Sequence, residues 1–147
     1  MTARRAWRMA SSAICIGASQ VGCAAATTDS ATALVSVAGT WTYTGSRAGQ
    51  TAPTTGTLAL TQDRTVQFSG TLDASERDAL GNVHRVIGVV SGRTIDAATV
   101  DFDIIVDPTV TRHHDGTVHG DSLTGSWVEL GDRGVVGSGT FRARRVR

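Results

Sequence analysis

Three histidines lie close together in the C-terminal half of the chain, and they are the first candidates for chemistry. His113, His114 and His119 fall within seven residues, beside Asp115 and Asp121. Imidazole nitrogens and carboxylate oxygens together can hold zinc. The spacing matches no specific zinc motif, and polar loops commonly carry such groups. We therefore predict a solvent-exposed loop and no metal site, with metal binding by the histidines as the alternative.

Two carboxylates, Asp101 and Asp103, could in principle support general acid–base catalysis. They are two positions apart, so in a strand they share one face, and that face is polar and implies no pocket. Pairing with arginines across a neighbouring strand is the simpler interpretation. With one bulge at Ala97–Ala98, a hairpin would place Arg85 opposite Asp101. We expect such a surface pair to contribute at most about 1 kcal/mol.

The composition removes most other kinds of catalysis. All 14 basic residues are arginine, so there is no lysine to form a Schiff base. The only cysteines, Cys15 and Cys23, leave the rest of the chain without a disulfide, a thiolate nucleophile or a cysteine metal site. The formal charge of +1 gives no bias toward nucleic acid. We predict a protein that is not an enzyme, uses no cofactor and binds no nucleic acid.

The N-terminal segment has the organisation of an export signal. A basic start, residues 4–8, precedes a weakly apolar stretch, Met9–Ser19, that is too short to span a membrane. The sequence Gln20–Cys23 (QVGC) then resembles a bacterial lipobox, in which a small residue precedes a cysteine that becomes lipidated. The resemblance implies a signal peptide over residues 1–22 and a lipid anchor on Cys23. A plain secretory signal cut near residues 24–26 is the alternative.

A short linker follows the predicted anchor. Residues 24–33 are small and polar, with nothing to bury, so they indicate a flexible tether. Removal of residues 1–22 leaves 11 arginines against 13 acidic residues, a net charge of −2. The folded domain is predicted over residues 34–147. We expect it in the cell envelope, anchored to the membrane, or free in the periplasm or outside the cell if the signal is a plain one.

From Leu34 onward, apolar and polar residues alternate with a period of two. Phe68, Gly70 and Leu72, for example, alternate with Ser69 and Thr71. This alternation is typical of half-buried antiparallel strands, and the many threonines and valines agree with it. Eight strands are predicted, at about residues 36–44, 55–62, 65–73, 83–91, 94–106, 113–120, 122–130 and 135–145.

Turn signals separate the predicted strands. Gly92–Arg93 is interpreted as a tight hairpin, and His114–Gly116 as another turn. Only residues 74–80 could hold a helical turn. Because no strand alternates with a long helix, the sequence excludes βαβ folds.

Eight short sequential strands with one apolar face fit an eight-stranded antiparallel up-and-down barrel, an all-β fold whose closure removes unpaired edges. A two-sheet β-sandwich is the alternative. The polar outer face argues against a membrane-spanning barrel. The predicted strand at residues 83–90 is apolar on both faces. Either residues 74–81 cover its outer face, or this face makes a subunit contact in a homodimer.

Two motifs connect the ends of the domain. Gly39–Trp41 (GTW) opens the first strand, and a Gly-Thr-Phe-x-Ala-x-Arg pattern ending at Arg145 closes the last. Together with eight strands they resemble the calycin barrels, meaning lipocalins and avidins, over nearly the whole mature chain. The resemblance implies that Trp41 plugs one end of the barrel and that an arginine packs on its ring. Alternation from an inward Phe141 selects Arg145 for this role and leaves Arg144 in solvent. The mature chain has too few tryptophans for an avidin biotin site, so the resemblance supports architecture and not a ligand.

Several glycines fall at inward positions and have two interpretations. They allow strands to bend in a narrow barrel, or they leave room for one small ligand. The cavity would be lined by apolar side chains: Tyr43, Leu58, Leu60, Phe68, Phe102, Trp127 and Phe141. We hypothesise a binding module for a small apolar or amphipathic ligand. The alternative is an envelope interaction protein or inhibitor that acts through its loops and has a filled barrel.

Overall fold

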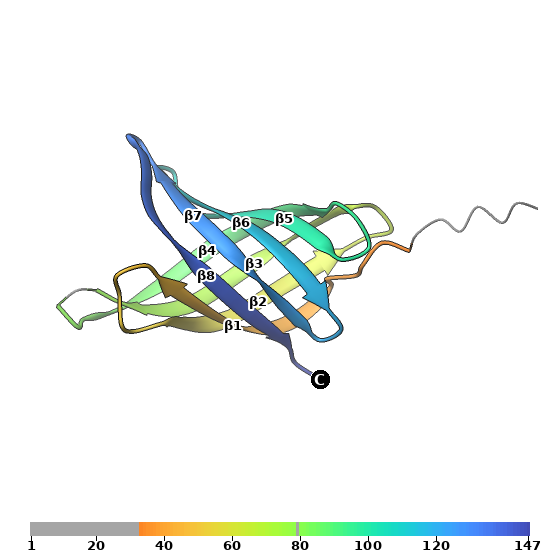
Figure 1. Cartoon of the computed structure of the whole chain (residues 1–147), viewed down its shortest axis with the longest axis horizontal. Helices are drawn as coiled ribbons and strands as arrows, with labels where there is room; N and C mark the ends of the chain where they lie inside the picture. Colours follow the sequence, from red (N-terminus) through yellow and green to blue (C-terminus); the bar gives the residue numbers. More distant parts are fainter. Residues whose placement is uncertain (1–32, 79) are drawn as a thin grey trace, which may run out of the picture. The chain divides into compact units, whose positions relative to one another are not determined.

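The computed structural model describes residues 33–78 and 80–147. Within them eight strands follow one another: β1 (Gly39–Arg47), β2 (Thr54–Gln62), β3 (Gln67–Arg77), β4 (Val83–Thr94), β5 (Thr99–Asp107), β6 (Val110–His119), β7 (Ser122–Gly131) and β8 (Gly134–Arg145). Each strand pairs antiparallel with the next, and β8 pairs with β1, so the sheet closes into a barrel (Figure 1). The predicted eight-stranded antiparallel barrel is confirmed, and the sandwich is excluded. The described part of the chain has no helix long and apolar enough to cross a membrane.

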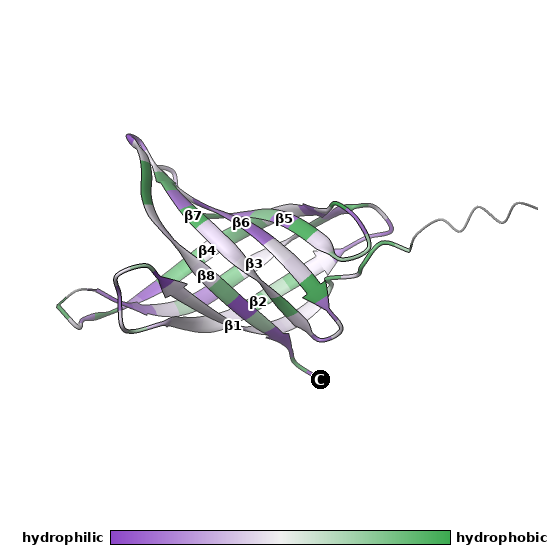
Figure 2. Ribbon diagram, in the orientation of Figure 1, coloured by the Kyte–Doolittle hydropathy of each residue, from purple (hydrophilic) through white to green (hydrophobic). Residues whose placement is uncertain are grey.

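The alternation of side chains explains why the strands close around one core. Apolar and polar residues alternate along the ribbon (Figure 2). The apolar residues that face inward are buried and form a single cluster, which includes Val37, Trp41, Leu58, Leu72, Val90, Val100, Ile104, Leu123 and Ala143. A closed barrel leaves no unpaired strand edge. Each strand therefore contributes its apolar face to the same interior.

Three predicted boundaries are wrong. β4 continues through Gly92 to Thr94, β6 continues through the turn signal at His114–Gly116, and β3 extends to Arg77, into the segment that could have held a helical turn. A Cβ on Gly92 would lie 2.4 Å from the Cβ of Phe102. The glycine is thus required by close packing inside a strand and not by a turn.

The longer β4 also changes the predicted cross-strand pairing. Arg93, and not Arg85, lies opposite Asp101, and its Nη2 is 3.3 Å from an oxygen of that carboxylate. Arg85 instead donates two hydrogen bonds to Asp73 on β3, at 2.9 and 2.6 Å. The expected Arg85–Asp101 pair is therefore wrong, because the hairpin turns at residues 95–98.

The outer face of β4 carries an exposed apolar patch. Ile87 and Val89 are 56% and 61% exposed, and Ile105 on β5, the cross-strand neighbour of Val89, is 45% exposed. The expectation that residues 74–81 cover this face is wrong, because part of that segment continues β3 within the barrel wall.

The barrel has two ends of different character. At the Trp41 end, residues 33–38 lead into β1 and β8 finishes. At the Arg47 end lie the connections between β1 and β2, β3 and β4, β5 and β6, and β7 and β8. In Figure 1 the Trp41 end is toward the right and the Arg47 end toward the left.

Candidate functional site

The Trp41 end is closed by the chain itself. Trp41 has no exposed surface, and its Nε1 donates to the carbonyl of Val37 at 2.9 Å. The guanidinium of Arg145 lies over the Trp41 ring, 4.4 Å from its centroid. Arg145 also donates to the carbonyls of Ser36 and Ala38. The cation therefore binds the ring and the incoming chain together.

Gly39 is part of the same arrangement. Its φ of 130° is a left-handed conformation that other residues rarely adopt, and a Cβ there would lie 3.1 Å from Nη1 of Arg145. Glycine lets the chain turn into β1 directly beneath the guanidinium.

The middle of the barrel is filled by the side chains predicted to line a cavity. The structure brings all seven together in the core, and none is more than 5% exposed: Tyr43, Leu58, Leu60, Phe68, Phe102, Trp127 and Phe141. Phe102 packs against Phe141 and Phe68, with ring centroids 5.7 and 6.0 Å apart. These distances are typical of directly packed aromatic pairs. The rings therefore contact one another where a ligand would have to lie.

His114 lies inside this core, not in an exposed loop. It has no exposed surface and stacks on Phe102 at 4.6 Å. Its Nδ1–H donates to the carbonyl of Arg112 at 3.0 Å, so the neutral ring accepts the Tyr43 hydroxyl at Nε2, 3.2 Å away. Burial lowers the pKa of His114 to about 4 and raises the pKa of Tyr43. Each group satisfies the other, and this explains how a polar pair is tolerated in the core.

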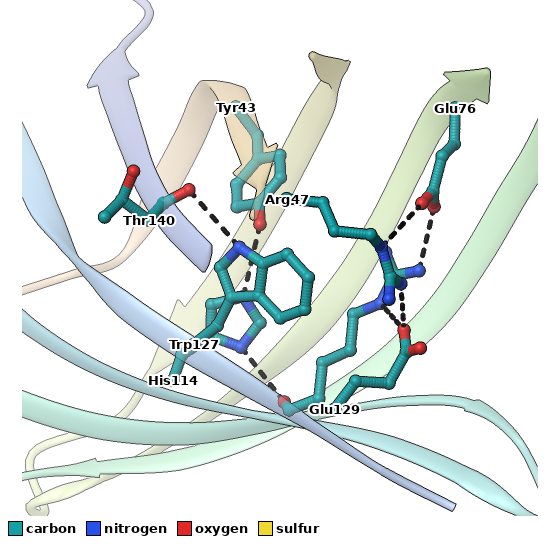
Figure 3. A network of polar contacts seen from close by, with 8 residues as sticks. Tyr43, Arg47, Glu76, His114, Trp127, Glu129 and Thr140 are labelled. Carbon is teal, nitrogen blue, oxygen red and sulfur yellow. Dashed lines mark hydrogen bonds and ion pairs between the residues drawn. The ribbon is translucent and has the colours of Figure 1, made fainter. Parts of the chain in front are cut away.

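Toward the Arg47 end, four charged side chains from four strands point into the barrel (Figure 3). Glu129 accepts hydrogen bonds from Arg47 at 2.7 Å and from Arg112 at 2.6 Å. Glu76 accepts from Arg112 at 2.8 Å, and its other oxygen lies 3.6 Å from Nε of Arg47. We call these four residues the ion network. Its two positive and two negative charges balance.

The ion network is half to fully buried and lies against Trp127. Arg112 and Glu129 are each 7% exposed. The guanidinium carbons of Arg47 and Arg112 lie 5.1 and 5.5 Å from the Trp127 ring centroid, and Trp127 Nε1 donates to the carbonyl of Thr140 at 3.2 Å. Burial opposes ionisation of Glu129, but hydrogen bonds from the two arginines outweigh it and lower its pKa.

The ion network is not the simplest way to fill a barrel. Apolar side chains of similar volume are often as stable as a buried ion pair, or more stable. Arg47 Nε is moreover buried without a hydrogen-bond partner. Unsatisfied buried donors are rare and call for an explanation. The network is therefore the strongest candidate for a functional feature in the described residues.

A hollow of about 310 Å³ borders the ion network at the Arg47 end. Its volume is at the lower end of the range for small-molecule sites. It is lined by polar and apolar groups: Arg47, Gln50, Glu76, Arg77, Asp78, His84 and Val86. Hydrogen bonds from His84 and Asn82 hold the pKa of Asp78 well below its usual range. The hollow thus offers fixed charges of both signs beside an apolar wall.

Sequence reasoning missed the ion network, although a signal was present. Arg112 lies two positions from His114, and Glu129 two positions from Trp127, so both occupy inward positions of their strands. Arg47 lies four positions from Tyr43, and Glu76 lies two positions from Ala74, so both also occupy inward positions. Charged residues at inward positions near one end of four strands would have indicated the network.

The remaining predicted sites lie elsewhere. Cys23, the predicted lipidation site, is outside the described residues. His113 points outward from β6, where a hydrogen bond to Asp103 raises its pKa. His119 ends β6 and is exposed. The three histidines are therefore not brought together.

Comparisons with known proteins identify the architecture only. No protein-family model and no curated protein matches the chain. Several solved structures resemble it, among them the following three. EF1p2_mFAP2b, solved bound to DFHBI, is 16% identical over 74% of this chain and 93% of its own, with a TM-score of 0.57. The redesigned β-barrel b11L5F_LGL is 14% identical over 75% and 91%, with a TM-score of 0.58. A de novo designed fluorescence-activating β-barrel is 17% identical over 74% and 93%, with a TM-score of 0.53.

At such low identity these likenesses show the fold alone. The chain is similar to small β-barrels, and its own strands form a closed barrel of eight.

Proposed function

We propose that the protein is an exported, lipid-anchored binding module that takes a small amphipathic ligand at the Arg47 end of its barrel. The observation that carries this proposal is the buried ion network beside a hollow of about 310 Å³. Val86 and the aliphatic part of Arg77 would contact the apolar part of the ligand. Arg47, Gln50 and Glu76 would contact its polar part. Because side chains fill the middle of the barrel, we expect the ligand site at this end instead.

The position of the tether supports this assignment. The described chain enters the barrel at the Trp41 end, where Ser36 and Ala38 are held by Arg145. An anchor on Cys23 would therefore be joined to the barrel through the Trp41 end, while the ligand would bind at the opposite end. The ten residues 24–33 reach at most about 35 Å when extended.

The structural neighbours add support of a general kind. EF1p2_mFAP2b was solved bound to DFHBI, and the de novo designed barrel is described as fluorescence-activating. Barrels of this size can therefore hold one small ligand. A ligand of this protein would have to complement the charges of the ion network.

The amphipathic dye 8-anilino-1-naphthalenesulfonate tests the proposal. Two single-tryptophan variants, both carrying Trp7→Phe, are compared: Trp41→Phe keeps Trp127, and Trp127→Phe keeps Trp41. Saturable binding of the dye should give more efficient energy transfer from Trp127 than from Trp41. Gln50→Phe, which fills the hollow from an exposed position, should weaken binding at least about tenfold. Gln67→Phe, an equally exposed glutamine at the Trp41 end, should leave it unchanged.

A different result would support the alternative function. Absence of saturable binding by the folded protein, or equal weakening by both glutamine variants, would contradict a ligand site at the Arg47 end. The filled core and the exposed Leu130, Val135 and Val136 near the β7–β8 connection would then favour an interaction protein or inhibitor that acts through its loops.

We also propose that the outer face of β4 binds a second copy of this chain. Exposed Ile87 and Val89 supply an apolar centre, and Ile105 extends it onto β5. Asp73 and Arg85, of opposite charge, lie beside the patch. A two-fold contact could therefore place each of them against its opposite in the second copy.

A further inference from the structure

A second polar group lies on the outside of the barrel wall, on β5 and β6. The strand register places Asp101 directly opposite Asp115, and Asp103 directly opposite His113. Like charges in directly opposite positions destabilise a sheet. Arg93 reaches only one oxygen of Asp101, at 3.3 Å. The arrangement therefore favours a further cation between the strands.

The ring of His113 is oriented as a metal ligand would be. Its Nδ1 lies 2.8 Å from a carboxylate oxygen of Asp103, which can only accept, so Nδ1 carries the hydrogen. In the neutral ring this leaves the lone pair on Nε2. Nε2 lies 3.8 Å from Asp115 Oδ2, beyond hydrogen-bond distance. A carboxylate that fixes one nitrogen while the other stays free is the usual surrounding of a metal-binding histidine.

Asp101 completes the group. Arg93 holds its Oδ2, while Oδ1 is directed to the His113 side, 3.7 Å from Nδ1. Asp101, His113 and Asp115 each offer one ligand atom, His113 through one of its two ring nitrogens, and these three atoms lie within 4.8 Å of one another. A hollow of about 340 Å³, also lined by Asp101 and His113, leaves room for solvent on the open side.

We propose that Asp101, His113 and Asp115 form a zinc site on the outer wall of the barrel, with Asp103 as a positioning residue. One imidazole nitrogen with carboxylate oxygens suits zinc, while magnesium and calcium prefer oxygen ligands alone. Water would complete a tetrahedral shell. Bound zinc would offset the repulsion between the facing carboxylates and link β5 to β6. This site is independent of the proposed ligand site.

Zinc titration against a chromophoric chelator tests the site. The untagged full chain with Cys15→Ser and Cys23→Ser, at about pH 8, should bind one Zn²⁺ saturably. His113→Gln should abolish that binding, and Asp103→Asn should weaken it about 10–100-fold. The matched control is His84→Gln, which removes another exposed histidine that pairs with an aspartate, Asp78. It should bind as the parent does.

Thermal unfolding gives a second readout that does not depend on the chelator. Zinc should raise the melting temperature of the parent by several degrees and have no such effect on Asp115→Asn. Without zinc, Asp115→Asn should be at least as stable as the parent, because it removes a like-charge contact. Equal zinc binding by the parent and His113→Gln, or a loss of binding in His84→Gln alone, would overturn the proposal.

Discussion

Trp41 and Arg145 offer a direct test of packing at the residue scale. Trp41→Ala should lower the free energy of unfolding by about 3–5 kcal/mol, because the ring is fully buried. Arg145→Ala should cost less, since the cation–π contact is worth about 0.5–2 kcal/mol. In the Trp41→Ala background most of that smaller cost should vanish, because the two side chains are in contact. Denaturant unfolding of the double-mutant cycle measures this.

Arg144 is the matched control for Arg145. It lies next in sequence but is exposed and points to the other side of the wall. Arg144→Ala should change the stability by less than about 0.5 kcal/mol. Additive effects in the cycle, or equal losses from the two arginines, would show that the ring and the cation are not coupled.

Buried His114 should make stability depend on pH. Its pKa in the folded state is about 4, while an unfolded histidine titrates near its ordinary value of 6.5. Between these values the unfolded chain binds more protons, so stability is lost as the pH falls from about 6.5 toward 4, by roughly 3 kcal/mol in total. Below that range this contribution is constant. Urea unfolding at a series of pH values measures the slope.

The variant His114→Phe isolates this contribution. It keeps an aromatic ring against Phe102 but has no proton to bind, so the slope between pH 4 and 6.5 should become shallower. Arg112, Glu76 and Glu129 lie nearby and are common to both proteins. An unchanged slope would mean that His114 is protonated in the folded protein, in conflict with its buried hydrogen bonds.

At the scale of the elements, the exposed apolar face of β4 should control self-association. The double variant Ile87→Thr/Val89→Thr keeps β-branched side chains for the strand but removes the apolar centre. We expect the parent to dimerise with increasing concentration and this variant to remain monomeric in light scattering coupled to size exclusion. Val135→Thr/Val136→Thr, which alters two exposed valines of β8, is the control and should still dimerise. A monomeric parent at high concentration would contradict the contact.

The elements also show what the sequence could and could not predict. The alternation of apolar and polar residues was sufficient to predict eight strands, because each strand places one face in the same core. Turns were less certain, since Gly92 and Gly116 have the composition of turns. Both glycines lie within strands, at positions where a neighbouring side chain approaches the backbone: Phe102 at Gly92 and Leu123 at Gly116. These contacts join residues on neighbouring strands, so no local pattern reports them.

The candidate site was harder to predict for the same reason. Tyr43 and Trp127 were recognised as inward residues, but whether they line a cavity or fill it depends on the packing of all strands together. Predicting the ion network required a further step, because a charged residue at an inward position normally argues against a strand. Only the closed barrel shows that Arg112 and Glu129 meet partners there.

For the whole molecule, the proposed anchor gives a test of location. Cys23→Ala should move the exported protein from the membrane fraction to the soluble fraction, because the lipid attachment point is lost. Cys15→Ala, which changes the other cysteine within the predicted signal peptide, should leave the protein in the membrane fraction. Fractionation followed by immunoblotting measures both. If the parent is already soluble after export, the plain secretory signal is the correct interpretation.

The pairing of β1 with β8 bears on the order of events during the proposed export. Trp41 lies opposite Arg145, so the ladder that closes the barrel joins the first strand to the C-terminal part of β8. Before these residues emerge, β1 has a free edge that can pair with other chains. Such distant contacts also form slowly, because a long loop must close first. If the proposed export delivers the chain N-terminus first, the chain must therefore stay unaggregated, with its barrel open, until Arg145 has crossed.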